Sequence, residues 1–132
     1  VVIMITLGTG IGTALFVDGH LAPNAELGHI QMNGEDAERQ AADSARQRED
    51  LTWKQWGKRL NQYFQTLDFL LAPDLFIVGG GVSKKSEKFF EFIKTRAPLV
   101  TAQMLNEAGL IGAAMAAYAL VQTSNEVSNQ SA

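Results

Sequence analysis

The sequence predicts an α/β domain, and three observations support that fold class. Short apolar segments alternate with longer amphipathic segments along the 132 residues, without an internal repeat. Two of the apolar segments run directly into glycine-rich turns, at residues 8–12 and 79–81. The segment Thr52–Leu71 carries large apolar residues at spacings of three and four, which is typical of a helix with one buried face. A chain of this length is expected to form one domain with a modest core.

The first part of the chain is expected to form strands and an irregular loop. Val1–Thr6 is apolar enough for a buried strand, and the glycine turn after it reverses the chain into a second strand at Thr13–Val17. The pair Asp18-Gly19 is typical of a hairpin turn, because both residues tolerate positive φ. The stretch Pro23–Asn33 is irregular, and such loops carry function when a rigid scaffold positions them. Asp36–Arg48 is polar and permits a helix, although alanines are its main apolar residues.

The second part of the chain is expected to alternate helices and strands. Thr52 is a suitable N-cap for the helix at 52–71, and Pro73 ends it because proline cannot continue a helix. Trp53 and Trp56 belong to the apolar stripe of that helix and are interpreted as packing residues. The remaining expected elements are a strand at Leu75–Val78, a helix from Ser83 or Ser86 to about Thr95 with Phe89, Phe90 and Ile93 on its buried side, a strand at Leu99–Met104 and an alanine-rich helix at Gly109–Val121.

Composition and charge exclude several classes of function. The net charge is −3, whereas a broad nucleic-acid-binding surface is normally basic, so no nucleic-acid partner is expected. No apolar run approaches the roughly 20 residues of a membrane span, so no membrane association is expected. The chain has no cysteine, which excludes a disulfide framework and a thiolate zinc site and favours a cytoplasmic location.

The two ends of the sequence suggest a piece of a longer protein. Val1–Ile5 enters a buried type of strand directly, with no initiator methionine and no leading loop. The segment 122–132 is polar and has no aromatic residue. We therefore expect a domain at 1–121 followed by a flexible tail at 122–132.

The two glycine turns are candidate anion sites. Glycines at the end of a strand let a ligand approach the backbone closely, and they point successive N–H groups at an anion. Two such turns in one domain suggest a nucleotide or a polyphosphate held between them. The alternatives are an ordinary tight hairpin for the first turn and, for the second, a strand-to-helix connection that needs glycine for packing.

A third motif lies between the turns, Asn24-Ala25-Glu26-Leu27-Gly28-His29. The order and spacing of the three motifs resemble the ROK family of sugar kinases, within the actin and hexokinase superfamily, and most closely its polyphosphate glucokinases. The resemblance covers most of the chain, from Val1 to about Ala117. It implies a ribonuclease H-like, actin-like ATPase domain with a mixed sheet flanked by helices, corresponding to the C-terminal, large domain of a sugar kinase.

The resemblance also implies roles for individual residues. In the family pattern Glu26 and His29 bind sugar hydroxyl groups; a solvent-facing carboxylate and a capping or core histidine are the alternatives. Glu38 is a third candidate sugar ligand, since residues 34–38 occupy the place of the cysteine-rich zinc loop of other family members; a carboxylate favoured in the first turn of a helix is its alternative. Lys84 could bind a phosphate chain or be a solvated surface lysine. The candidate phosphate- or nucleotide-binding residues are Thr6, Gly8, Thr9, Gly10, Gly12, Gly79, Gly80, Gly81 and Lys84.

The resemblance places the catalytic aspartate and the first phosphate loop in an N-terminal domain that this sequence lacks. No aspartate of this chain stands in the family's catalytic context, so no catalytic residue and no metal ligand is assigned, and the chain alone is expected to be inactive. The implied reaction of the whole protein is transfer of a phosphoryl group from polyphosphate, ATP or both to the 6-hydroxyl of glucose, with Mg²⁺ as cofactor. A homodimer is implied as well.

Three other interpretations stay open from the sequence. The protein could be an ATP-dependent kinase for another hexose, such as mannose or fructose. It could be a sugar-sensing transcriptional regulator of the same family, although such regulators generally keep the zinc loop whose cysteines are missing here. It could also be a stand-alone assembly module of actin-like ancestry, which would form oligomers without sugar affinity.

Overall fold

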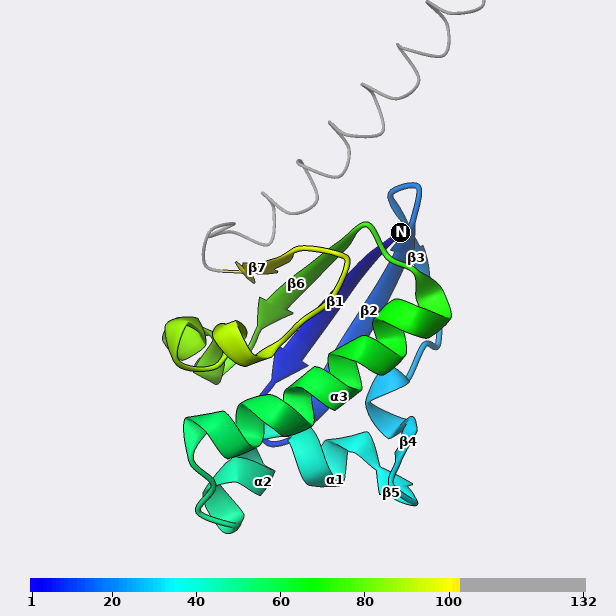
Figure 1. Cartoon of the computed structure of the whole chain (residues 1–132). Coiled ribbons are helices and arrows are strands. Elements are labelled where there is room, and N and C mark those ends of the chain that lie inside the picture. The colour runs from blue at the N-terminus through cyan, green and yellow to red at the C-terminus, as the bar shows by residue number, and fades with distance from the viewer. Residues whose placement is uncertain (103–132) are drawn as a thin grey trace, which may run out of the picture.

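The computed structural model describes residues 1–102 (Figure 1). The expected helix at Gly109–Val121 and the expected tail at 122–132 lie outside the described residues, as does the end of the expected strand Leu99–Met104. Within the described part, a five-stranded sheet is combined with one long helix and several short ones. No helix of residues 1–102 is long and apolar enough to cross a membrane.

The sheet is mixed, as the sequence analysis expected, with strand order β3-β2-β1-β6-β7. β1 lies in the middle; it pairs antiparallel with β2 and parallel with β6, and β7 extends the parallel part. The antiparallel pairs follow from short turns, whereas the parallel pair β1–β6 needs the long crossover that contains the helices. The strands are β1 (Val2–Leu7), β2 (Ile11–Val17), β3 (His20–Ala22), β6 (Leu75–Gly79) and β7 (Leu99–Thr101).

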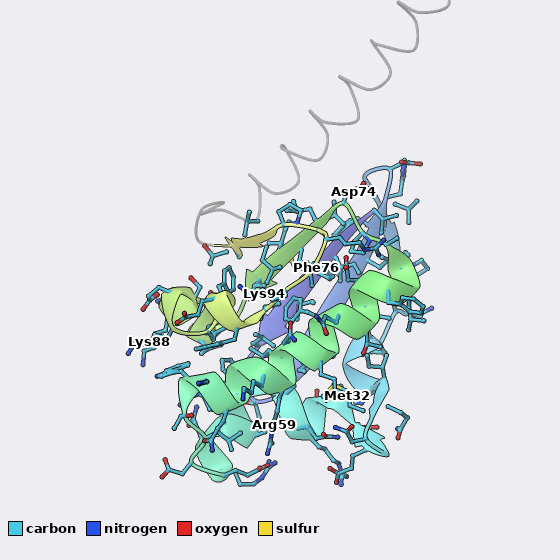
Figure 2. All side chains as sticks on the ribbon, in the orientation of Figure 1. Met32, Arg59, Asp74, Phe76, Lys88 and Lys94 are labelled. Atoms are coloured by element: carbon cyan, nitrogen blue, oxygen red, sulfur yellow. The ribbon has the colours of Figure 1, made fainter. Side chains whose placement is uncertain are left out.

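One face of the sheet forms the core together with the long helix α3 (Trp53–Leu71), which crosses that face in Figure 1. Alternate residues of β1, namely Ile3, Ile5 and Leu7, are buried because successive strand side chains point to opposite faces. Phe76 of β6 stacks edge-to-face on Phe64, with ring centroids 5.1 Å apart, and lies between sheet and helix in Figure 2. Each large apolar side chain buried in this way stabilises the fold by about 1.5–3 kcal/mol. The buried stripe of α3 consists of Trp56, Gly57, Leu60, Tyr63, Phe64, Leu67 and Asp68.

The ends of α3 are those that the sequence predicts. The Thr52 hydroxyl accepts a hydrogen bond from the Gln55 N–H at 3.2 Å, and the Thr52 N–H donates to Gln55 Oε1 at 2.9 Å. This reciprocal capping box satisfies two N–H groups that the helix itself leaves unpaired. At the other end Ala72 adopts a left-handed conformation with φ 42°, and Pro73 follows directly. The interpretation of Trp53 and Trp56 as packing residues also agrees with the structure, since Trp56 is fully buried and Trp53 packs against the core.

The loop and the polar segment after β3 are more structured than expected. The irregular stretch contains a short 3₁₀ helix η1 (Leu27–His29), and a two-stranded hairpin joins β4 (Gln31–Met32) to β5 (Glu35–Asp36). The expected helix at Asp36–Arg48 is divided into α1 (Ala37–Ala41) and α2 (Asp43–Arg48). Ala42 breaks it with an extended conformation, φ −65° and ψ 157°. Its alanines are buried, which allows these short helices to pack closely on α3.

The expected helix from Ser83 or Ser86 to about Thr95 is wrong. The chain forms 3₁₀ segments instead, η2 (Gly81–Lys88), which is kinked at Lys85, and η3 (Phe90–Phe92), and it is extended from Ile93. The buried residues Val82, Phe89 and Ile93 are seven and four positions apart, a spacing that also suits one face of an α-helix, so the spacing alone did not distinguish the two structures. The segment folds against α3 instead, where Phe92 lies on Gly57: a β-carbon on Gly57 would come within 2.6 Å of the Phe92 ring.

Candidate functional site

The two glycine turns lie at the same edge of the sheet. β1 and β6 are parallel, so their carboxyl ends lie together, and Thr6 is paired with Gly79 in the register. The crevice outside the carboxyl ends of parallel strands is a frequent ligand site in α/β folds. An open pocket occupies this edge, and it is lined by Thr6, Leu7, Gly8, Thr9, Gly10, Ile11, Gly12, Glu38 and Gly80.

Gly80 fixes the distance between the two turns. Its φ of +87° is a conformation that residues with a side chain rarely adopt. A β-carbon at this position would lie 2.2 Å from the Leu7 carbonyl oxygen, at the start of the first turn. The second turn can therefore lie directly against the backbone of the first only because residue 80 is glycine.

The first turn is held from behind by α2. The Ser44 N–H donates to the Gly8 carbonyl at 3.1 Å, and the Ser44 hydroxyl donates to the Thr9 carbonyl at 2.6 Å. Inside the turn, the Gly8 N–H donates to the Gly10 carbonyl at 3.0 Å. Two carbonyl groups of the turn are thus drawn toward α2. Within residues 1–102 no acceptor is found for the N–H groups of Thr9 and Gly10, so they are available to an anion.

Glu38 closes the pocket on the side of α1. Its Oε2 accepts a hydrogen bond from the Ile11 N–H at 2.8 Å. The helix that carries it is anchored by its buried alanines and by the Trp56 indole N–H, which donates to the Ala41 carbonyl at 3.0 Å. A carboxylate at this position repels phosphate oxygens and attracts hydroxyl groups. Glu38 therefore gives this side of the pocket an acceptor suited to a hydroxyl group rather than to a phosphate.

The motif with Glu26 and His29 packs directly on the first turn. A β-carbon on Gly28 would lie 2.3 Å from the Ile11 carbonyl oxygen, so the η1 segment touches the backbone that follows the turn. Thr13 fastens the loop twice: its hydroxyl donates to the Ala25 carbonyl at 2.9 Å and accepts from the Leu27 N–H at 3.1 Å. Gly28 and Glu38 both contact Ile11, the first at its carbonyl oxygen and the second at its N–H group. Of the three sugar-ligand candidates, Glu38 lines the pocket, whereas Glu26 and His29 lie on the segment that packs against Ile11 and are not among the residues that line it.

His29 is oriented by a residue that the sequence analysis did not assign. Its Nδ1 lies 3.1 Å from Asp36 Oδ2, and Gln31 donates to the other oxygen of the same carboxylate at 3.2 Å. With Nδ1–H donating to Asp36, the exposed Nε2 is the acceptor of the ring, ready for a hydroxyl donor. The Asn33-Gly34 pair in the hairpin, with φ of 53° and 83°, folds Asp36 back onto His29. That pair is a typical hairpin signal, so the contact could have been inferred from the sequence.

Tyr63 supports the loop from the core. Its hydroxyl donates to the Leu27 carbonyl at 3.3 Å, and burial raises the pKa of this phenol far above its usual value. The phenol therefore stays protonated throughout the physiological range and keeps the O–H that it donates to Leu27. It ties the sugar-ligand motif to α3.

The remaining candidates lie beside the pocket. Gly79 is buried at the end of β6, Gly81 begins η2 with open space next to its α-carbon, and Lys84 is exposed in η2. None of these residues lines the pocket described above. No group of three or more His, Asp or Glu side chains within residues 1–102 could hold a metal ion. The described residues therefore do not fit a magnesium cage by themselves.

The chain is similar to known polyphosphate glucokinases. The chain is 42% identical over 118 residues to a polyphosphate glucokinase of Mycobacterium tuberculosis (strain CDC 1551 / Oshkosh). The aligned residues make up 89% of this chain and 44% of the relative. A polyphosphate glucokinase of Mycobacterium leprae is 38% identical over 118 residues, covering 36% of that relative. The chain is homologous to part of the polyphosphate glucokinases. It spans less than half the length of these curated relatives, and no family model matches it.

Solved structures place this part of the polyphosphate glucokinases in the ROK fold. An inorganic polyphosphate/ATP-glucomannokinase from Arthrobacter sp. strain KM superposes with a TM-score of 0.77 at 46% identity, covering 92% of this chain and 47% of that one. A ROK family glucokinase from Streptomyces griseus, solved in complex with glucose and AMPPNP, has a TM-score of 0.63 at 23% identity. The match covers 85% of this chain and 58% of that structure. The expected actin-like α/β class with a mixed sheet is therefore confirmed.

Proposed function

We propose that the protein containing this chain transfers a phosphoryl group from inorganic polyphosphate or ATP to the 6-hydroxyl of glucose. One observation carries the proposal: the motif with Glu26 and His29 packs on the backbone of the first glycine turn, at the sheet edge where both glycine turns meet. A sugar site and a phosphate site would then share a border. The 42% identity to polyphosphate glucokinases supports the same reaction.

The first turn would bind the donor. Negative charge spreads over the oxygens of the transferred phosphoryl group, and fixed N–H donors stabilise that charge without reorganising. The N–H groups of Thr9 and Gly10 and the Thr9 hydroxyl are the donors proposed for this role, while Ser44 holds the carbonyl groups of the turn away. Thr6, Gly8, Gly12 and Gly80 form the rest of the phosphate surface.

The loop and α1 would bind the sugar. The Glu26 carboxylate accepts from two hydroxyl groups, His29 Nε2 accepts from another, and Asp36 keeps the imidazole in place. Glu38, hydrogen-bonded to the first turn, would accept from the hydroxyl nearest the donor. These contacts hold the acceptor oxygen next to the donor phosphate, which converts an encounter of two molecules into a reaction within one complex.

We infer that the catalytic base lies outside this chain. No aspartate of residues 1–102 faces the pocket. This chain would be the C-terminal, large domain of the kinase, with the domain at 1–121, and the donor would arrive with Mg²⁺, which neutralises charge on its phosphates.

Mannose is a second candidate acceptor. The Arthrobacter structure at 46% identity is a glucomannokinase. Glucose and mannose differ only in the orientation of the 2-hydroxyl, and the proposed ligands Glu26 and His29 are both exposed.

The test is phosphorylation of glucose and of mannose by the full-length protein, with polyphosphate or ATP as the sole donor and this chain alone as a control. The proposal expects glucose 6-phosphate from the full-length protein with at least one donor and none from this chain alone. A full-length protein that binds glucose but is inactive with both donors would contradict the kinase and favour a sugar sensor. Activity of this chain alone would contradict the assignment of the base.

A further inference from the structure

A cluster of cations lies around Trp53, beside the pocket but not in it. The guanidinium carbon of Arg46 is 4.2 Å from the centroid of the Trp53 ring, and the ammonium nitrogens of Lys88 and Lys85 are 5.5 and 6.0 Å from it. We call Arg46, Lys85 and Lys88 the Trp53 basic cluster. It is a local excess of positive charge in a chain whose net charge is −3.

The cluster is incompletely neutralised. Arg46 is paired with Asp43, with 2.7 Å between Nε and Oδ1. Lys85 and Lys88 form no ion pair with a carboxylate of residues 1–102. An aromatic face attracts a cation by about 0.5–1 kcal/mol at an exposed site, whereas like charges held near one ring repel each other. A bound polyanion would reduce the repulsion among the three cations.

The segments that carry the cluster also reach the pocket along the chain. α2 holds the first turn through Ser44 and presents Arg46 two residues later. η2 starts immediately after Gly80, which lines the pocket, and carries Lys85 and Lys88 away from it. Figure 2 shows Lys88 at the outer end of this segment, beyond the first turn of α3. Two separate stretches of chain thus leave the pocket and present their cations on the same indole ring.

Trp53 itself is not available as a platform for a base. Its ring lies parallel to that of Phe89 at 6.2 Å, edge-to-face with Trp56 at 5.9 Å, and under Arg46. The exposed groups at this place are cations, so the chemistry favours a chain of phosphates over a nucleoside.

We propose that the Trp53 basic cluster binds the distal phosphates of an extended polyphosphate whose terminal phosphates lie at the first glycine turn. The inference rests on the proposed function and adds a donor preference to it. ATP ends in an uncharged nucleoside after its third phosphate, whereas polyphosphate continues to present negative charge along its length. The cluster therefore favours the longer donor through contacts that ATP does not make.

The test uses the full-length protein, its K85Q/K88Q variant and a matched control, K54Q/K58Q, which removes the same charge from exposed lysines of α3. We expect kcat/KM for long-chain polyphosphate, divided by that for ATP, to fall about tenfold in K85Q/K88Q and to stay unchanged in the control. The salt dependence of polyphosphate use should also become shallower. An equal loss with both donors, or an equal loss in the control, would overturn the inference.

Direct binding separates this inference from the proposed function. Long-chain polyphosphate is titrated into wild-type protein and into each variant, without sugar, and the Kd is measured by calorimetry. The inference expects about tenfold weaker binding for K85Q/K88Q only. Unchanged binding in that variant contradicts the cluster even if glucose is phosphorylated, whereas weaker binding with no sugar phosphorylation supports the cluster and contradicts the kinase.

Discussion

The two glycine-rich turns lie at the same sheet edge but are held in different ways. The first turn is fastened by hydrogen bonds from Ser44 and to Glu38, which leave the N–H groups of Thr9 and Gly10 available to a ligand. The second turn is placed by close backbone contact, since Gly80 lies against Leu7. Glycine permits close packing in both turns, against the side chains of Glu38 and Thr6 in the first and against the backbone of Leu7 in the second.

The largest effect is expected at the packing glycine. Gly80→Ala places a β-carbon 2.2 Å from a carbonyl oxygen at a φ of +87°, so we expect a loss of stability of about 2–4 kcal/mol. Gly81→Ala is the matched control, because nothing lies within 4 Å of its β-carbon. The measurement is chemical denaturation of both variants of the full-length protein. Equal stability of the two variants would show that the second turn is not fixed by this contact.

The binding turn should respond in function more than in stability. Ser44→Ala removes the hydroxyl that draws the Thr9 carbonyl toward α2, at a cost of about 1 kcal/mol. We expect the KM for the phosphoryl donor to rise by about fivefold to tenfold while the KM for glucose changes little. Steady-state kinetics with each substrate varied in turn measure both constants. Ser86→Ala, in η2, is the control, and a rise in its donor KM as large as that of Ser44→Ala would remove the role given to Ser44.

A smaller effect is expected at the residue that orients His29. Asp36→Asn keeps the size of the side chain but removes the charge beside Nδ1. We expect the KM for glucose to rise about threefold to tenfold, since a misplaced imidazole weakens one hydroxyl contact. The donor KM should be unaffected. A changed donor KM with an unchanged glucose KM would place His29 on the donor side of the pocket.

The smallest effect concerns the buried carboxylate of Asp68, which pairs with the exposed side chain of Arg96 outside the pocket. Burial by itself raises the pKa of Asp68, but hydrogen bonds from the Arg96 and Ala97 N–H groups and the Arg96 guanidinium outweigh it and lower the pKa below its usual value. A carboxyl with a lowered folded pKa contributes stability above its unfolded pKa, near 4, and loses that contribution as the pH falls through its folded pKa. We expect the stability difference between wild type and Asp68→Asn to shrink below about pH 4. Denaturation curves at pH 7 and pH 3 measure it, and a constant difference would contradict this role.

The sequence predicted an element correctly where residues close together in the chain determine its structure. The spacing of Trp56, Leu60 and Leu67 on one face, the N-cap at Thr52 and the stop at Pro73 predicted α3 within one residue at its start. The segment 83–95 was predicted wrongly because its shape is set by a remote contact, the packing of Phe92 on Gly57 of α3. Local patterns do not contain information of that kind.

The same distinction applies to the candidate site. Glu26, His29 and the glycine turns were found from motifs; the structure places the first turn, Glu38 and Gly80 around one pocket and the segment with Glu26 and His29 against Ile11. Ser44 was missed because the residue it holds, Thr9, is 35 positions away, and its role depends on how α2 folds back over the first turn. Arg96 also depends on a remote partner, because the fold pairs it with the buried carboxylate of Asp68, 28 positions away.

The central claim is that the sugar loop and the donor turn form the two halves of one site. The most direct test is glucose phosphorylation by the full-length protein and its Glu26→Gln variant, with glucose and polyphosphate varied separately. The account predicts a fall in kcat/KM for glucose of about 100-fold, with an unchanged KM for polyphosphate and an unchanged unfolding midpoint. A variant with the same glucose kinetics as the wild type would contradict it.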